Sequence, residues 1–164
     1  MPTVSGPQSS SVKTIRQRVL LPATPEQVYE ALVDPKLHAE FTGAGATGSR
    51  RVGGRFTAWD GYITGVHRQL VPGERIVQDW TTTEWPDGAP ASRLEIRLKR
   101  VTRGTELRMV HSKVPASQAE GYRHGWVDYY WTPLTTFFEQ STERSIAEAA
   151  PARGRKAAAR RRKR

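Results

Sequence analysis

Seven residues near the C-terminal end, Gly125-Trp126-Val127-Asp128-Tyr129-Tyr130-Trp131, hold two of the five Trp and two of the five Tyr of the chain. With their flanks they predict one long helix over residues 116–144. At about 100° per residue, the apolar side chains of this helix cover an arc of roughly 200°, whereas a surface helix usually shows a stripe of about 100°. Such a helix must be wrapped by a concave partner or line a cavity, so the sequence predicts a binding function.

Short strands joined by turns precede this helix. Leu94, Ile96 and Leu98 alternate with charged residues, which is typical of an antiparallel strand with one buried face. The pair Asp60-Gly61 predicts a hairpin turn, and further turn signals lie at 71–74 and 86–88. Strands that follow one another through tight turns pair side by side, so we expect about six of them in an antiparallel sheet.

The N-terminal part predicts a strand over residues 12–21 and two short helices. Thr24-Pro25-Glu26-Gln27 combines a capping Thr, a Pro at the first helical position and a Gln placed for a capping box. This helix should end before Asp34-Pro35, and the second should cover residues 35–41. The order predicts an α+β fold, in which a curved antiparallel sheet wraps around the long C-terminal helix. We expect Pro133 to kink that helix, so that a pocket opens beside it.

Length and composition predict one domain of a globular protein. The 164 residues fit a single domain at 12–144, with a disordered arm at 1–11 and a disordered Ala/Arg-rich tail at 145–164. The absence of Cys excludes disulfides. We expect no signal peptide, no membrane partner and a cytoplasmic location. The absence of Asn and the excess of Arg over Lys favour a bacterial source with a GC-rich genome.

The positive charge belongs to the tail. Eight basic residues near the C-terminal end account for all but two of the formal net charge of +10. These residues are Arg153, Arg155, Lys156, Arg160, Arg161, Arg162, Lys163 and Arg164. Two hypotheses stay open: a solvated solubility tail, or a salt-sensitive contact with nucleic acid or another polyanion.

No cofactor, metal or catalytic residue is predicted. Residues 43–48 spell G-x-G-x-x-G, but a dinucleotide site needs a strand before these glycines and a helix after them. Here a short helix is expected before them, so the pattern favours a loop. His38, His67 and His124 show no ligand spacing, and neither Cys nor a G-x-S-x-G elbow supplies a nucleophile.

Four stretches resemble the START-like, or SRPBCC, superfamily, whose fold is the helix-grip (Bet v-like) fold. Within it, the chain is most similar to the domain named for the C-terminal half of the activator of the ninety-kilodalton heat-shock protein ATPase. The resemblance covers about residues 12–139 and rests on residues 23–32, 53–65 and 76–80, and on Gly125-Trp126 with Tyr129-Tyr130. It implies a cavity between sheet and long helix that holds an apolar or aromatic ligand in many relatives. Some relatives are enzymes, such as polyketide cyclases, and many are binding modules.

We expect Trp126, Tyr129 and Tyr130 to form the inner wall of the cavity, while Trp131 and Phe138 pack elsewhere or form a dimer contact. His111 shares a strand face with Leu107 and Met109 and should point inward. It is then either a satisfied core residue or a polar handle for the ligand. The predicted ligand-binding residues are Phe41, Trp59, Trp80, His111, Tyr122, Trp126, Tyr129 and Tyr130.

The sequence leads to three hypotheses about function. The leading one is a non-catalytic domain that binds a small apolar or aromatic molecule. The alternatives are a chaperone-interacting protein that resembles the ATPase activator, and a cyclase- or hydratase-type enzyme that uses His111. The sequence leaves open whether the protein is a monomer or a homodimer.

Overall fold

The computed structural model describes residues 11–149, and side chains through residue 144. Residues 1–10 and 150–164 lie outside the described part, and with them almost all of the predicted arm and every basic residue assigned to polyanion binding. The strands are β1 (Val12–Leu21), β2 (Thr47–Gly48), β3 (Arg55–Ala58), β4 (Ile63–Val71), β5 (Arg75–Thr82), β6 (Ser92–Val101) and β7 (Gly104–Pro115). The helices are α2 (Pro25–Val33), α3 (Pro35–Thr42), α4 (Ala116–Trp126), the π-helical turn η2 (Val127–Trp131) and α5 (Thr132–Ala149).

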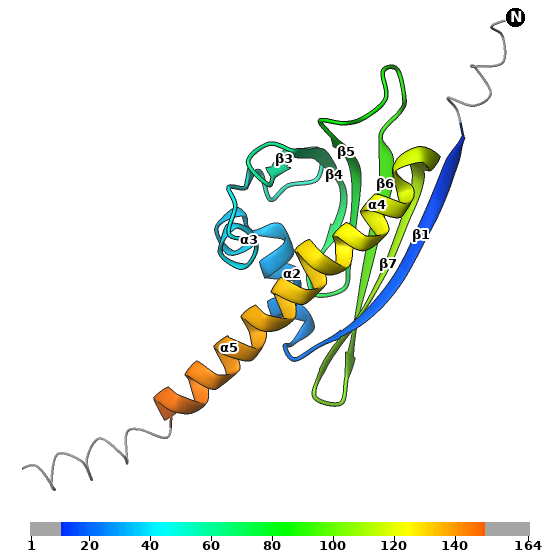
Figure 1. Cartoon of the computed structure of the whole chain (residues 1–164). Helices are drawn as coiled ribbons and strands as arrows, with labels where there is room; N and C mark the ends of the chain where they lie inside the picture. Colours follow the sequence, from blue (N-terminus) through cyan, green and yellow to red (C-terminus); the bar gives the residue numbers. More distant parts are fainter. Residues whose placement is uncertain (1–10, 150–164) are drawn as a thin grey trace, which may run out of the picture.

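One curved sheet and one long helix make up the fold, as predicted. The seven strands lie in the order β1-β7-β6-β5-β4-β3-β2, and every neighbouring pair is antiparallel. Helices α4 and α5 continue one another across the concave side of this sheet, and α2 and α3 pack near their middle (Figure 1). The helix-grip α+β fold is therefore confirmed.

Local sequence signals fix the two short helices. The Thr24 hydroxyl accepts a hydrogen bond from the backbone N–H of Gln27 at 3.1 Å, and the Gln27 side chain accepts one from the backbone N–H of Thr24 at 2.9 Å. This is the predicted capping box. Asp34 then ends α2 and caps α3, because its carboxylate accepts a hydrogen bond from the N–H of Lys36 at 3.2 Å.

The effect of Pro133 is a π-turn. Proline has no N–H to donate into the helix, and the turn just before it is π-helical, with the Thr132 N–H bonded to the Val127 carbonyl five residues back. Residues five apart then meet: the rings of Trp126 and Trp131 stack with centroids 5.3 Å apart. A uniform 100° step would have separated these two rings, so the predicted helical wheel is wrong across this turn.

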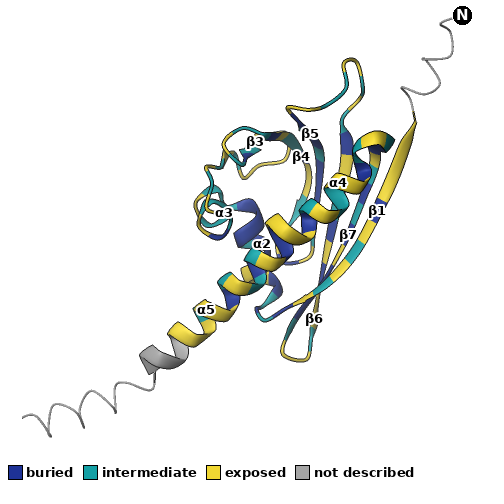
Figure 2. Cartoon of the chain, in the orientation of Figure 1, coloured by how far each residue is buried: buried dark blue, intermediate teal, exposed yellow. Residues whose placement is uncertain are grey.

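The apolar face is also narrower than predicted. Val127 is 44% exposed and Tyr129 57% exposed, whereas Trp131 and Leu134 are buried. In Figure 2 the buried residues of the long helix face the sheet and the exposed ones face outward. Trp131 packs on β1, where its indole N–H donates to the Gln17 side-chain oxygen at 2.7 Å. Helix α5 continues to Ala149, past the helix end predicted at residue 144. No helix within residues 11–149 is long and apolar enough to cross a bilayer.

Gly65 allows the sheet to close over Phe56. The two residues are paired across β3 and β4. A Cβ atom on Gly65 would lie 2.2 Å from the Asp79 carbonyl oxygen and 2.4 Å from the Phe56 ring. Only glycine therefore fits at this position.

We expect Gly65→Ala to lower the free energy of unfolding by about 1–3 kcal/mol, the usual cost of overpacking. Urea denaturation measures this change. Gly121→Ala is the matched control, because a Cβ there meets no atom within 4 Å. Since Gly121 lies inside α4, that substitution should instead stabilise the protein by about 0.5–1 kcal/mol. Equal stability of wild type and Gly65→Ala would contradict the packing argument.

Candidate functional site

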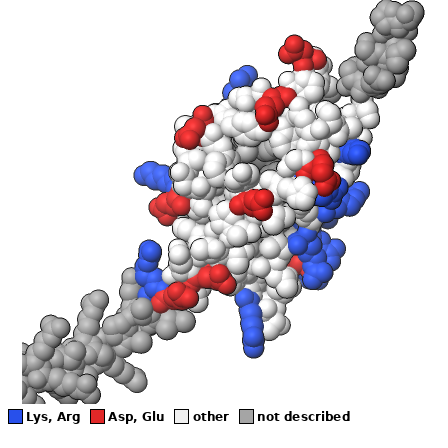
Figure 3. Space-filling view, viewed as in Figure 1, with Lys and Arg blue, Asp and Glu red and all other residues white. Residues whose placement is uncertain are grey.

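A cavity of about 650 Å³ lies between α4 with its π-turn and the β3–β5 part of the sheet. This volume is within the range of small-molecule sites, roughly 300–1,000 Å³. In Figure 3 the surface between α4 and β3–β5 is mostly uncharged, and the charged side chains lie around its rim. Six of the eight predicted ligand residues line the cavity: Trp59, Trp80, Tyr122, Trp126, Tyr129 and Tyr130.

Aromatic rings form its wall. Trp126 contacts the ring of Trp80 from the sheet with centroids 5.8 Å apart, and that of Tyr130 along the helix at 4.7 Å. Across the opening, Trp59 and Tyr129 meet edge to face at 5.4 Å. Trp59 lies in the hairpin turn at residues 59–62 that the Asp60-Gly61 pair predicts. Trp80 and Trp126 are buried while Tyr129 is exposed, so the wall runs from the core to solvent.

A cluster of hydrogen-bonded polar side chains occupies one end of the cavity. The Tyr62 hydroxyl donates to the Glu84 carboxylate at 2.6 Å, and the Gln118 amide donates to the Glu84 carbonyl at 2.6 Å. The Tyr122 hydroxyl donates to the Gln118 side-chain oxygen at 2.6 Å and contacts Thr82 at 2.7 Å. Burial raises the pKa of Tyr122 and, with the Glu84 hydrogen bond, that of Tyr62, so both phenols stay protonated.

The ligand-binding residues predicted from the sequence do not include Tyr62, Glu84 and Gln118. One signal was available: Gln118 lies four residues before Tyr122 in the predicted helix, and residues four apart share a helix face. No comparable signal pointed to Tyr62 or Glu84, because their position depends on how β4 and β5 pair.

His111 belongs to the core and does not line the cavity. Its Nδ1 accepts a hydrogen bond from the Trp126 indole N–H at 3.1 Å, and its Nε2 lies 2.8 Å from the Ser92 hydroxyl. Trp can only donate, so Nδ1 carries no proton and the Nε2–H donates to Ser92. The Ser92 hydroxyl in turn donates to the Trp80 carbonyl at 2.7 Å. Both ring nitrogens are occupied and His111 is not among the lining residues, which favours the satisfied core residue over the polar handle for a ligand.

Phe41 is likewise a core residue. It is 6% exposed and packs against Tyr130 and Phe137, with ring centroids 5.9 and 6.3 Å away. It is separated from the cavity by Tyr130, which itself lines the wall. The sequence places Phe41 among the ligand-binding residues, but its ring turns toward Tyr130 and Phe137 of the long helix.

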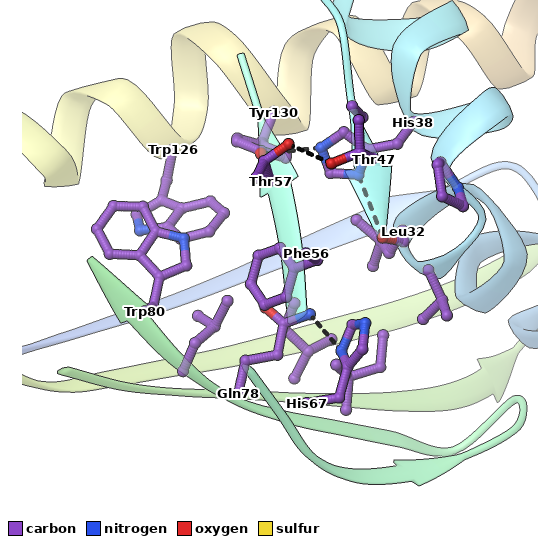
Figure 4. A pocket seen from close by; sticks show the side chains of 16 residues that line it. Leu32, His38, Thr47, Phe56, Thr57, His67, Gln78, Trp80, Trp126 and Tyr130 are labelled. Carbon is purple, nitrogen blue, oxygen red and sulfur yellow. Dashed lines mark hydrogen bonds between the residues drawn. The ribbon is translucent and has the colours of Figure 1, made fainter. Parts of the chain in front are cut away.

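A second, smaller cavity lies beneath α2 and α3 (Figure 4). Its volume is about 40 Å³, far below the ~150 Å³ of a cavity that holds benzene. The Tyr130 hydroxyl donates to Nε2 of His38 at 2.9 Å, while Nδ1 of His38 donates to the Leu32 carbonyl at 3.1 Å. The Gln78 amide donates to Nδ1 of His67 at 3.3 Å. Burial lowers the pKa of both histidines, which favours their neutral forms. Its small volume makes this cavity a gap in the packed core.

The glycine-rich stretch at 43–48 is a fixed loop. Gly43 ends α3 with φ at 78°, so a helix leads directly into the glycines, and the next element is the strand β2. The N–H of Gly45 donates to the Asp60 carboxylate at 2.8 Å, and the Gly45 carbonyl accepts from the Asp60 N–H at 2.9 Å. These bonds tie the loop to the hairpin that carries Trp59. Within residues 11–149, no three His, Asp or Glu side chains are grouped to hold a metal ion.

The chain matches a known family along most of the described fold. Residues 22–139 match the family model described as "Activator of Hsp90 ATPase homolog 1-like protein". Over 117 residues the chain is 34% identical to the Homo sapiens protein named "Activator of 90 kDa heat shock protein ATPase homolog 1". That alignment covers 70% of this chain and 34% of the human protein. The chain thus spans about a third of the length of the curated relatives it matches.

Solved structures share the fold. An HSP90 activator from Plasmodium falciparum is 20% identical, with a TM-score of 0.70 over 76% of this chain and 94% of that one. A protein from Chromobacterium violaceum is 29% identical, with a TM-score of 0.60 over 77% of this chain and 96% of that one. The likeness to the Plasmodium protein concerns the arrangement of the sheet around the long helix.

We expect stability to fall as the pH drops below about 6.5. Burial lowers the pKa of His111 from 6.5 to about 3. Between pH 6.5 and 3 this histidine is therefore protonated in the unfolded chain but neutral in the folded protein, and protonation favours unfolding. Each such group contributes a slope of up to about 1.4 kcal/mol per pH unit. His38 and His67 shift in the same direction. Urea denaturation from pH 7 to 4 measures the slope, and His111→Gln should reduce it. An unchanged slope in that variant would contradict the buried neutral state of His111.

Proposed function

Because this chain belongs to the family of Activator of Hsp90 ATPase homolog 1-like proteins, whose fold grips a helix with a sheet, we propose that it binds a small apolar or aromatic molecule. The observation that carries this proposal is the cavity of about 650 Å³ with its aromatic wall. Concave sites with apolar walls and a few converging polar groups are the usual form of small-molecule sites.

The polar end narrows the chemistry of the ligand. Tyr62 engages one oxygen of the Glu84 carboxylate, which leaves this group able to accept a further hydrogen bond. A flat ring lying along Trp59, Trp126 and Tyr129 would bring a hydroxyl or amine substituent toward Glu84. The proposed ligand is thus an aromatic molecule with a hydrogen-bond donor at one end.

The cyclase or hydratase hypothesis loses its proposed acid–base residue. Both nitrogens of His111 are used inside the core, and no histidine of the described residues lines the cavity. Among the residues described, Glu84 is the only acid that lines the cavity, so no pair of carboxylates is available for acid–base work there. Binding without catalysis is therefore the function we propose.

Chaperone interaction is the second candidate. It is favoured by the 34% identity to the human ATPase activator over 117 residues. Since this chain covers only about a third of that protein, the activity of the whole activator is not transferred with the fold. The polyanion contact of the tail and the choice between monomer and homodimer remain predictions.

Filling the cavity tests the first proposal. We expect anilinonaphthalene sulfonate to bind saturably and to quench tryptophan emission, because Trp59, Trp80 and Trp126 line the cavity. In Gly121→Leu the new side chain projects from α4 into the same space, and the affinity should fall by at least ~10-fold, or about 1.4 kcal/mol. Tryptophan fluorescence titration measures both values.

Two further variants make this test specific. Gly121→Ala changes the same position without filling the cavity, and its affinity should stay within about twofold of the wild type. Tyr129→Ala removes a ring that is 57% exposed at the opening, so it should weaken binding in a folded protein. If Gly121→Leu binds the probe as the wild type does, the cavity is not the site.

The chaperone candidate has its own readout. If the domain is sufficient for activation, it should raise the rate of ATP hydrolysis by a purified Hsp90-type chaperone, and the effect should saturate with domain concentration. Serum albumin at the same concentration serves as the control. A rate that does not respond to the domain removes this candidate and leaves the ligand proposal untouched.

A further inference from the structure

Four arginines stand in one row across the outer face of the sheet. Arg18 on β1 pairs with Arg108 on β7, Arg108 with Arg97 on β6, and Arg97 with Arg75 on β5. Neighbouring strands lie about 4.8 Å apart, so the row spans roughly 14 Å. It faces away from the long helix, because the alternate residues of these strands, such as Leu98, are buried. We call these four residues the arginine row.

Repulsion between the four positive charges destabilises the sheet, and nearby carboxylates neutralise only half of that charge. Like charges directly opposite one another on neighbouring strands destabilise a sheet. Only two carboxylates join the four guanidinium groups. Glu106 contacts Arg18 and Arg108, each at 2.8 Å, and Glu95 contacts Arg97 at 2.8 Å and Arg75 at 2.9 Å. The row with its two acids therefore keeps a net charge of about +2.

The guanidinium groups remain available for more acceptors. Arg18, Arg97 and Arg108 are 60, 66 and 65% exposed, and each uses its Nε atom for its ion pair. Arginine has five N–H donors, four of them on the Nη atoms. Arg75 is more buried, and its Nε has no partner among the residues described. Most of the donor capacity of the row thus lies unused.

A depression of about 430 Å³ follows the row. Four basic side chains line it, those of Arg75, Arg97, Arg108 and Lys99, together with Glu74, Glu106 and Leu98. Basic groups outnumber acidic ones there, and the surface is concave. This depression suits an extended segment that carries several anionic groups better than it suits the flat surface of a folded partner.

We propose that the arginine row binds an acidic segment of a partner protein, through Asp or Glu carboxylates. Guanidinium groups recognise carboxylates through charge-assisted hydrogen bonds, and the row already holds two carboxylates of its own chain, those of Glu95 and Glu106, as ion pairs. The outward positions of β1, β7, β6 and β5 carry no aromatic residue in the described part of the chain, so bases of a single-stranded nucleic acid have nothing on which to stack. The site is separate from the aromatic cavity, because it lies on the opposite face of the sheet.

The test measures binding of a fluorescein-labelled peptide of alternating Glu and Ser to the full chain by anisotropy. In the double variant Arg97→Gln with Arg108→Gln, the affinity should fall about tenfold or more, since two charge-assisted contacts are lost. Glu95 keeps Arg75 and Glu106 keeps Arg18 as ion-pair partners, so this variant should fold. Its thermal unfolding is measured alongside.

The matched control is Arg51→Gln with Arg55→Gln. It removes the same charge from two exposed positions outside the row, and it should leave the affinity nearly unchanged. Equal losses in both double variants, or no loss in either, would show that general basicity or the tail binds the peptide, and would overturn the proposal. It would also be overturned if the row variant lost affinity for a DNA duplex while it bound the peptide as before.

Discussion

The hydrogen bond from the Trp126 indole to Nδ1 of His111 holds the long helix on the sheet. His111 is completely buried, and a buried polar group without a partner would cost several kcal/mol. The bond therefore extends into a chain through Ser92 to the Trp80 carbonyl, which links α4 to β7, β6 and β5. This chain also fixes the rings of Trp80 and Trp126. The inner wall of the cavity is thus positioned from behind by His111 and Ser92, neither of which lines the cavity.

The π-turn next to Pro133 decides which rings line the cavity. It lets Trp126 stack on Trp131, so one face of the Trp126 ring is covered from within the helix while the ring still borders the cavity. Tyr129, in the same turn, comes to the opening and meets Trp59. π-turns occur often at functional sites, and here a single proline removes the N–H that a regular α-helix needs.

Local signals were sufficient to predict the fold. The Thr24 capping box, the Asp60-Gly61 turn and the alternation of Leu94, Ile96 and Leu98 each act within a few residues, and the structure confirms all three. The site was predicted in part. The aromatic positions were visible because they cluster, but a uniform helical wheel separates the Trp126 and Trp131 rings, which stack where the helical repeat changes. The inward direction of His111 was correct, yet its two hydrogen-bond partners, Ser92 and Trp126, come from the neighbouring strand β6 and from the long helix.

The arginine row is a second feature that local sequence signals do not predict. Along each strand its members look like ordinary solvated charges that alternate with apolar residues. Their meeting depends on the register of four strands, and that register is set by the apolar inner face and by turn lengths. A slip of one residue would bury these arginines, so the packing that surrounds the aromatic cavity also fixes the row. One register therefore serves both faces: it places Trp80 toward the helix and Arg75, five residues earlier in β5, toward solvent. Because residues of a strand alternate between the two faces, a basic outer row can be built without disturbing the wall within.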